Sequence, residues 1–191
     1  MQYDKISGFA DEIDMSLDVQ IENLKKLDIR YVEMRGVDGD NLIYHSDEKV
    51  HEIKKKLDDA GIALSALGTP LGKIGIEEDF ENHFEEFKRA IEVAHMMDAE
   101  NLRMFSFYIP EGENAKWKNA VWERMGRFAD YAAANDAVLL HENEKGIYGE
   151  MAAENLERGR DAIPARNGKV LSGPEAFSLS YEALVKILAA S

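Results

Sequence analysis

One short stretch of the sequence places four polar residues, whose side chains could bind a metal or transfer a proton, directly after an apolar run. The run Val138–Leu140 ends in His141, Glu142, Asn143 and Glu144. Alternate side chains of a strand share a face, so Glu142 and Glu144 are expected to point together, opposite to His141. Carboxylate oxygens suit Mn²⁺, Mg²⁺ or Zn²⁺, and a carboxylate beside such a metal can also act as acid or base. The stretch therefore predicts either a ligand at Glu142 or a solvated strand end, with His141 buried and hydrogen-bonded.

Three further polar residues follow apolar runs and are candidates for holding a small polar substrate. Glu33 could accept a hydrogen bond from a sugar hydroxyl, or pair with a neighbouring cation. Lys73 lies in the loop "TPLGKIG", whose glycines permit close approach to a phosphate or carboxylate; the alternative is a solvated lysine. Tyr108 lies near the end of the apolar run 101–110 and is the better pocket candidate, whereas Arg103 lies near its start and is expected to pack or pair.

The other histidines lie on or near helical stretches and show no metal-ligand spacing. We expect them at the surface: His45, His51, His83 and His95.

Short apolar runs alternate with amphipathic stretches, and these are the elements that would position the polar residues. The runs predicted to be strands are 5–10, 30–36, 62–68, 101–110 and 137–144. The stretches predicted to be helices are 16–29, 46–60, 80–94 and 117–134. Ser46 is a typical N-cap and Gly61 a typical C′ residue, so the second helix has the clearest boundaries.

This βα repeat, with a period of roughly 30 residues, predicts a parallel sheet with right-handed crossovers. A doubly wound open sheet and a (β/α)8 barrel both fit the pattern. The doubly wound dinucleotide-binding fold would need a glycine-rich turn after the first strand, which "GFADEID" lacks. Polar residues at the strand ends favour the barrel, so we predict an α/β fold of the TIM-barrel type.

The pattern breaks where a sixth strand should follow. Residues 157–172 show neither the helical nor the strand periodicity of apolar residues and are predicted to be an irregular junction. Residues 173–191 are predicted to form a C-terminal helix. Its apolar face would carry Phe177, Tyr181, Leu184 and Leu188. The expected organisation is one domain, 1–191, an incomplete barrel of about five βα units (1–156) plus this helix.

Composition narrows the class of protein. The 191 residues are 45% hydrophobic, enough for one core, and carry a formal net charge of −14. That charge argues against a nucleic-acid partner, which would require a basic face. The sequence has no cysteine, which excludes disulfides and thiolate sites and fits a cytoplasmic protein. No signal peptide and no apolar run long enough for a membrane span is present.

The order of these segments resembles a known family. "SGFADEI", "YVEMRG", "LGTPLGKI", "LRMFSFY" and "LLHENEKGIYGE" are similar to the sugar phosphate isomerase/epimerase group, which has a xylose isomerase-like TIM barrel. The group is related to the family 2 apurinic endonucleases. The resemblance covers residues 5–156. It implies a sugar or sugar phosphate substrate, a divalent metal (Mn²⁺, Mg²⁺ or Zn²⁺), and Glu142 as both metal ligand and acid/base carboxylate.

The sequence departs from this family after Glu142. The family's other metal ligands, an Asp, a His and a second Glu, come from strands six to eight, and no strand carrying them is found. The segment "SGPEAFSLSYEALVKIL" resembles the family's last helix, which implies that an internal block of the barrel is missing; the alternative is an unrelated helix. Two hypotheses follow. The first is a sugar isomerase or epimerase, inactive if its metal site is incomplete. The second is a catalytically silent, truncated barrel that acts as a self-associating or binding scaffold.

A homo-oligomer is expected because an incomplete barrel exposes strand edges and apolar interior. A nuclease activity is disfavoured by the net charge and by the lack of the many His and Asp ligands of a multi-metal phosphodiesterase.

Overall fold

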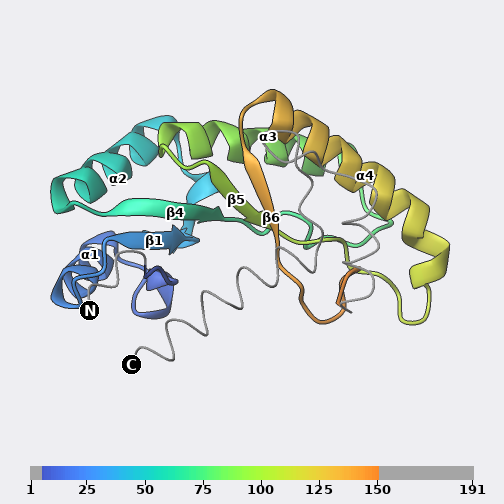
Figure 1. Cartoon of the computed structure of the whole chain (residues 1–191), viewed down its shortest axis with the longest axis horizontal. Coiled ribbons are helices and arrows are strands. Elements are labelled where there is room, and N and C mark those ends of the chain that lie inside the picture. Colours follow the sequence, from blue (N-terminus) through green and yellow to red (C-terminus); the bar gives the residue numbers. More distant parts are fainter. Residues whose placement is uncertain (1–5, 151–191) are drawn as a thin grey trace.

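Short apolar segments separated by helices pair into a parallel sheet. The structure is a computed structural model that describes residues 6–150. Within this range the main sheet has four strands in the order β1-β4-β5-β6, so successive strands along the chain lie side by side (Figure 1). Their bounds are β1 (Tyr31–Met34), β4 (Ala63–Gly68), β5 (Asn101–Met104) and β6 (Val138–His141). All three pairings are parallel, as the βα repeat predicts.

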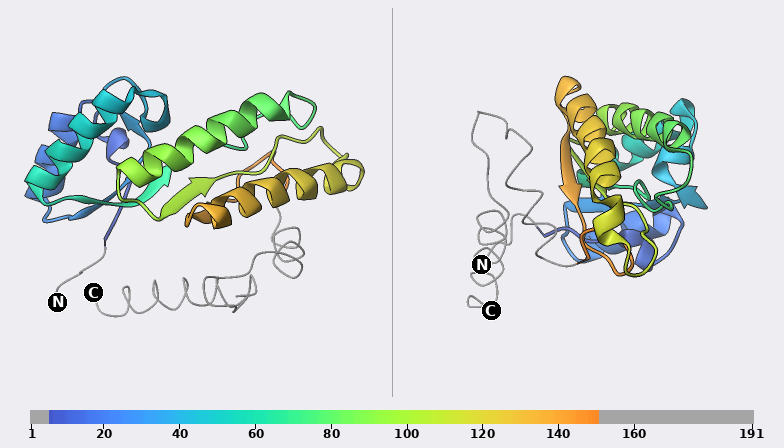
Figure 2. Two further views of the ribbon diagram at one scale, coloured as in Figure 1. Left: turned by 90° about the horizontal axis from the view of Figure 1, so that it is seen from above. Right: turned by 90° about the vertical axis from the view of Figure 1, so that its right-hand side faces the viewer.

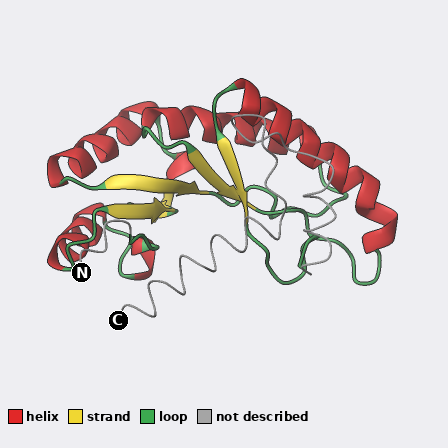
Figure 3. Ribbon diagram, in the orientation of Figure 1, coloured by secondary structure: helices red, strands yellow, loops and turns green. Residues whose placement is uncertain are grey.

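Helices follow the strands and cover one face of the sheet, giving two layers (Figures 2 and 3). The α-helices are α1 (Leu17–Lys26), α2 (Asp47–Ala60), α3 (Phe80–Met96) and α4 (Asn114–Ala134). A small hairpin and two single turns complete the described elements. These are η1 (Ala10–Glu12), β2 (Gly36–Val37), β3 (Asp40–Asn41) and η2 (Leu42–Tyr44). No α-helix in the described range is long and apolar enough to cross a membrane.

The ends of the second helix are those predicted from the sequence. Ser46 is the N-cap of α2, and its side chain accepts a hydrogen bond from the Lys49 backbone N–H at 3.3 Å. Gly61 ends the helix with φ of 70°, in the left-handed region that glycine adopts without strain. Aspartates take this left-handed conformation just after the other three helices: Asp28, Asp98 and Asp136.

The core lies between the helices and the sheet. Phe87 of α3 and Phe128 of α4 are fully buried, with ring centroids 4.5 Å apart. Leu67 of β4 is in register with Leu102 of β5, and both are fully buried. Because strand side chains alternate between faces, these leucines define the face that packs against the helices.

The predicted strands extend beyond the observed ones; the predicted strand 137–144, for example, ends at His141, so Glu142 and Glu144 lie beyond β6. Residues 6–9 of the predicted first strand are not a strand, although the Glu33 backbone N–H donates to the Gly8 carbonyl at 3.1 Å. The predicted strand 101–110 ends at Met104, since the Phe105 N–H donates to the Leu71 carbonyl of a loop rather than to a neighbouring strand. The predicted junction and C-terminal helix lie outside the described residues.

Candidate functional site

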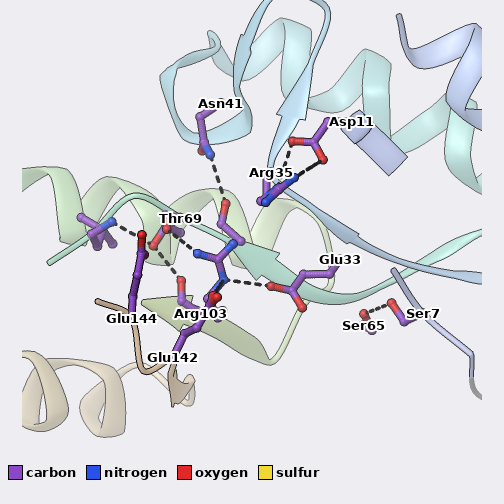
Figure 4. A network of polar contacts seen from close by, with 12 residues as sticks. Ser7, Asp11, Glu33, Arg35, Asn41, Ser65, Thr69, Arg103, Glu142 and Glu144 are labelled. Atoms are coloured by element: carbon purple, nitrogen blue, oxygen red, sulfur yellow. Dashed lines mark hydrogen bonds and ion pairs between the residues drawn. The ribbon is translucent and has the colours of Figure 1, made fainter. Parts of the chain in front are cut away.

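The carboxyl ends of the parallel strands bring three charged residues together. Glu33 comes from the end of β1, Arg103 from the end of β5, and Glu142 directly follows β6. Parallel strands of one sheet present these ends at the same edge, where barrel enzymes gather their chemistry. Figure 4 shows both carboxylates directed toward the Arg103 guanidinium.

Arg103 is the centre of this network. Its side chain is only 9% exposed, and its Nε donates to Glu33 Oε1 at 3.0 Å. The same Nε lies 3.0 Å from Glu142 Oε2 in an ion pair. Nη1 donates to the Thr69 carbonyl at 3.1 Å, so the guanidinium joins the ends of all four strands. A nearly buried cation is thus held by two carboxylates, an arrangement that fixes the direction of each.

The absence of a side chain at Gly68 makes room for this network. A Cβ at Gly68 would lie 3.0 Å from Arg103 Nη2 and 2.7 Å from Arg35 Cγ. A larger residue at the end of β4 would therefore displace one of the two arginines.

An aromatic ring supports a second cation at the edge. The Arg103 guanidinium carbon lies 4.7 Å from the centre of the Phe105 ring, and Lys73 Nζ lies 4.1 Å from the same ring. Lys73 Nζ also forms an ion pair with Glu144 Oε2 at 2.7 Å. Lys73 and Glu144 thus lie next to the Arg103 network, and the two glutamates after β6 have different partners.

Asp11 and Arg35 form a pair that sequence reasoning missed. Arg35 Nε donates to Asp11 Oδ2 at 3.0 Å and Nη2 donates to Oδ1 at 2.9 Å. The Gly36 N–H also donates to Asp11 Oδ2, and the guanidinium lies 4.0 Å from the Phe9 ring centre. The available signal was position, because Asp11 follows the first apolar run just as Glu142 follows the last.

Tyr108 is placed differently from the other predicted site residues. Its side chain is 39% exposed, and its backbone joins the loop that carries Lys73. The Tyr108 N–H donates to the Ile74 carbonyl and the Ile76 N–H donates to the Tyr108 carbonyl. Arg103 is paired, as predicted, and the role of Tyr108 as a substrate-binding residue stays a prediction.

The five histidines differ in how far their side chains are buried. His141 is half-buried, with Nε2 3.0 Å from Ser106 Oγ, as predicted. The prediction that His83 lies at the surface is wrong, because it is 5% exposed and hydrogen-bonded on both ring nitrogens. His51 and His95 are exposed, and His45 is half-buried with Nε2 2.8 Å from the Val37 carbonyl.

A divalent metal does not fit the described residues. Between positions 6 and 150, no three His, Cys, Asp or Glu side chains group in a way that could hold a metal ion. Glu142 could supply one carboxylate, but its Oε2 lies 3.0 Å from the Arg103 cation. One carboxylate falls short of the three or four protein ligands that a catalytic Zn²⁺ site uses.

Comparison with known proteins identifies the family. Residues 21–167 match the family model described as xylose isomerase-like TIM barrel. This chain belongs to that family. The resemblance found in the sequence and the barrel-type α/β fold are thereby confirmed. No curated protein matches the sequence.

Solved structures of this family share the fold at low identity. A xylose isomerase-like TIM barrel protein from Mycobacterium smegmatis, in complex with magnesium, has a TM-score of 0.63 at 16% identity, covering 82% of this chain and 60% of its own. A D-psicose 3-epimerase crystallised in the presence of D-fructose has a TM-score of 0.61 at 19% identity, covering 86% and 61%. The probable 3-DHS dehydratase AsbF of Bacillus anthracis has a TM-score of 0.67 at 16% identity, covering 81% and 57%.

The chain therefore spans about 60% of the length of these structures, consistent with an incomplete barrel. Divalent metals occur among the relatives, since a further similar structure, the IOLI protein, contains a bound zinc atom.

Proposed function

We propose that this chain binds a sugar or sugar phosphate at the carboxyl edge of its sheet and transfers a proton next to the sugar carbonyl, as isomerases and epimerases do. The observation that carries the proposal is the convergence of Glu33 and Glu142 on Arg103 at this edge. The family contains sugar epimerases with the same fold, which supports the substrate class.

In this proposal Glu142 is the catalytic carboxylate. Its side chain is 42% exposed and Oε2 is the atom paired with Arg103, so Oε1 would take the proton from carbon and return it to the neighbouring carbon of the enediol. Arg103 fixes the orientation of this carboxylate and places a positive charge near the oxygen on which negative charge develops. Glu33, Lys73 and Tyr108 would hold the substrate through its hydroxyl or phosphate groups.

No step of the proposal passes through a metal. Mn²⁺, Mg²⁺ or Zn²⁺ would need ligands beyond Glu142, and the described residues supply none that group with it. We therefore expect no stoichiometric uptake of Mn²⁺ by the chelator-stripped chain in a calorimetric titration. Micromolar uptake that is lost in Glu142→Gln but kept in Glu144→Gln would contradict this and would place further ligands outside residues 6–150.

The substrate class can be tested with a matched pair of ligands, D-fructose and D-fructose 6-phosphate. Lys73 is the more accessible of the two cations at the edge, with a side chain 33% exposed against 9% for Arg103, and a phosphate would compete with Glu144 for it. Lys73→Met should weaken binding of the phosphorylated sugar about tenfold, the loss of one charge-assisted hydrogen bond, and leave D-fructose binding nearly unchanged. Equal effects on both sugars would exclude phosphate recognition by Lys73, and binding of neither sugar to the wild type would contradict the proposal.

A second candidate function is that of a self-associating scaffold. Val138 and Leu140 of β6 are 36% and 40% exposed, and within the described residues β6 pairs with β5 alone. An unpaired strand edge next to exposed apolar side chains favours association with another chain.

Sedimentation velocity tests this second function. We expect a homo-oligomer for the wild type and dissociation in Leu140→Asp. The control is Leu27→Asp, since Leu27 is an equally apolar residue, 65% exposed, just after α1 and away from β6. A wild-type monomer at all concentrations would exclude the scaffold.

A further inference from the structure

His83 connects helix α3 to the loop that carries Lys73. It lies in the first turn of α3 and its side chain is 5% exposed. Its ring meets Phe107 and Phe128 edge-on, with centroids 6.4 and 6.2 Å away. A histidine so enclosed must satisfy both ring nitrogens by hydrogen bonds.

The two hydrogen bonds define the protonation state of the ring. The Gly72 backbone N–H donates to His83 Nε2 at 2.8 Å, so Nε2 carries no proton. Nδ1 lies 3.0 Å from Glu86 Oε2, an acceptor, so the single proton of the neutral ring is on Nδ1. Protonation of Nε2 would place two hydrogens face to face between the ring and Gly72, and this bond would be lost.

Gly72 has little freedom to move without changing the edge of the site. Its φ is +86°. A Cβ at this position would overlap the Phe105 carbonyl, so the loop backbone lies directly against Phe105, the residue that follows β5. The next residue is Lys73, which lies over the Phe105 ring and pairs with Glu144. A shift of Gly72 would therefore be passed on to Lys73 within one residue.

We infer that neutral His83 is a positioning residue, which holds Gly72 against Phe105 and thereby fixes Lys73 at the edge of the site, and that protonation of His83 releases this loop. The effect on the loop follows from the hydrogen bonds alone. Its consequence for substrate binding rests on the proposed role of Lys73.

The surroundings of His83 favour the neutral form at neutral pH. Burial lowers the pKa of His83 below its ordinary value of 6.5, and this is the largest effect. The carboxylates of Glu86 on α3 and Glu78 in the preceding loop oppose the shift, whereas Arg124 of α4 adds to it. The loop is thus expected to stay in place at pH 7 and to loosen as the pH falls through this lowered pKa of His83.

Two variants of His83 and a control distinguish the effect of its hydrogen bond to Gly72 from the effect of its side-chain volume. His83→Gln can offer an amide oxygen to Gly72 but cannot take up a proton. His83→Leu fills the space without an acceptor. His51→Gln is the matched control, because His51 is an exposed histidine on α2 that bonds a backbone carbonyl, that of Asp47.

Hydrogen exchange of the Gly72 amide, measured by NMR and corrected for its intrinsic pH dependence, tests the loop directly. In the wild type and in His51→Gln, protection should fall about tenfold as the pH is lowered through the pKa of His83, the loss of one hydrogen bond. In His83→Gln it should not change with pH. In His83→Leu it should be low throughout. Constant protection in the wild type, or a pH dependence that persists in His83→Gln, would overturn the inference, and this comparison stands even if His83→Leu fails to fold.

Binding of D-fructose 6-phosphate to the same variants separates this inference from the proposed function. We expect His83→Leu to weaken binding in the same direction as Lys73→Met, with His83→Gln close to wild type. If Lys73→Met weakens binding and a folded His83→Leu does not, the positioning role is overturned. If Gly72 exchange behaves as expected but neither variant alters binding, the substrate role of Lys73 is wrong and the loop contact of His83 is upheld.

Discussion

The two faces of the sheet differ although the same four strands form both. On the helix-covered face, Leu67 and Leu102 are fully buried. On the opposite face, Val138 and Leu140 of β6 are more than one-third exposed, and the Arg103 network with Glu33 lies at its carboxyl edge. Strand alternation thus separates two tasks, with stability concentrated on the face that the helices cover and the proposed chemistry at the open one.

The largest effect that distinguishes the faces should come from core truncation. Phe128→Ala, on the covered side, removes a fully buried ring in contact with Phe87 and should lower the free energy of unfolding by about 3–5 kcal/mol. Leu140→Ala, on the open side, should cost less than about 1 kcal/mol because its side chain is 40% exposed. Urea unfolding measures both, and equal costs would show that the open face is covered in solution.

A smaller effect is expected from the charge network at the open edge. Arg103→Met leaves Glu33 and Glu142 near each other without their shared cation. It should cost about 2 kcal/mol, less than for a fully buried pair because Glu142 is 42% exposed. The same urea experiment applies, with Arg127→Met as control, since Arg127 forms an exposed pair with Glu81 and its loss should cost little. A loss no larger than that of the control would mean that Arg103 does not hold the edge together.

Adding Glu33→Gln to Arg103→Met sharpens this test. The double variant removes one of the two carboxylates left without a partner, so part of the lost stability should return. Further destabilisation would contradict the assignment of Glu33 as a partner of Arg103.

The smallest effect is a pH dependence that starts on the covered side. Burial depresses the pKa of His83, so its contribution to stability is fully present above the unfolded-state value of 6.5 and is lost as the pH falls through the lower folded-state pKa. The wild type should therefore lose about 1 kcal/mol relative to His83→Gln between neutral and mildly acidic pH. Thermal unfolding across this range measures the difference, and parallel curves for the two proteins would exclude it.

The helices were predictable because their signals are local. Ser46 and Gly61 mark the ends of α2 within one turn of the residues they cap. The burial of His83 could also have been read locally, since it lies three residues after Phe80 and four before Phe87, on the apolar face of α3. The residue type, rather than its position, led to the incorrect prediction of a surface histidine.

The partners in the site were not predictable from the sequence in this way. Glu33 meets Arg103 through the register of β1 on β4 and of β4 on β5, including a register shift between Val32 and Glu33. Such a shift changes which side chains reach the edge and leaves no local sequence signal. The sequence could place Glu33 and Glu142 at strand ends, but only the sheet shows that they share the Arg103 guanidinium.

The central claim is that Glu142 transfers a proton next to a sugar carbonyl, and the most direct measurement is deuterium incorporation. D-Fructose and D-fructose 6-phosphate would be incubated in D₂O with the wild type, Glu142→Gln and Glu144→Gln, with and without Mn²⁺, and followed by NMR. We predict exchange at a carbon next to the carbonyl, reduced at least about 100-fold in Glu142→Gln and little changed in Glu144→Gln. No exchange with the wild type, or equal exchange with Glu142→Gln, would contradict the claim.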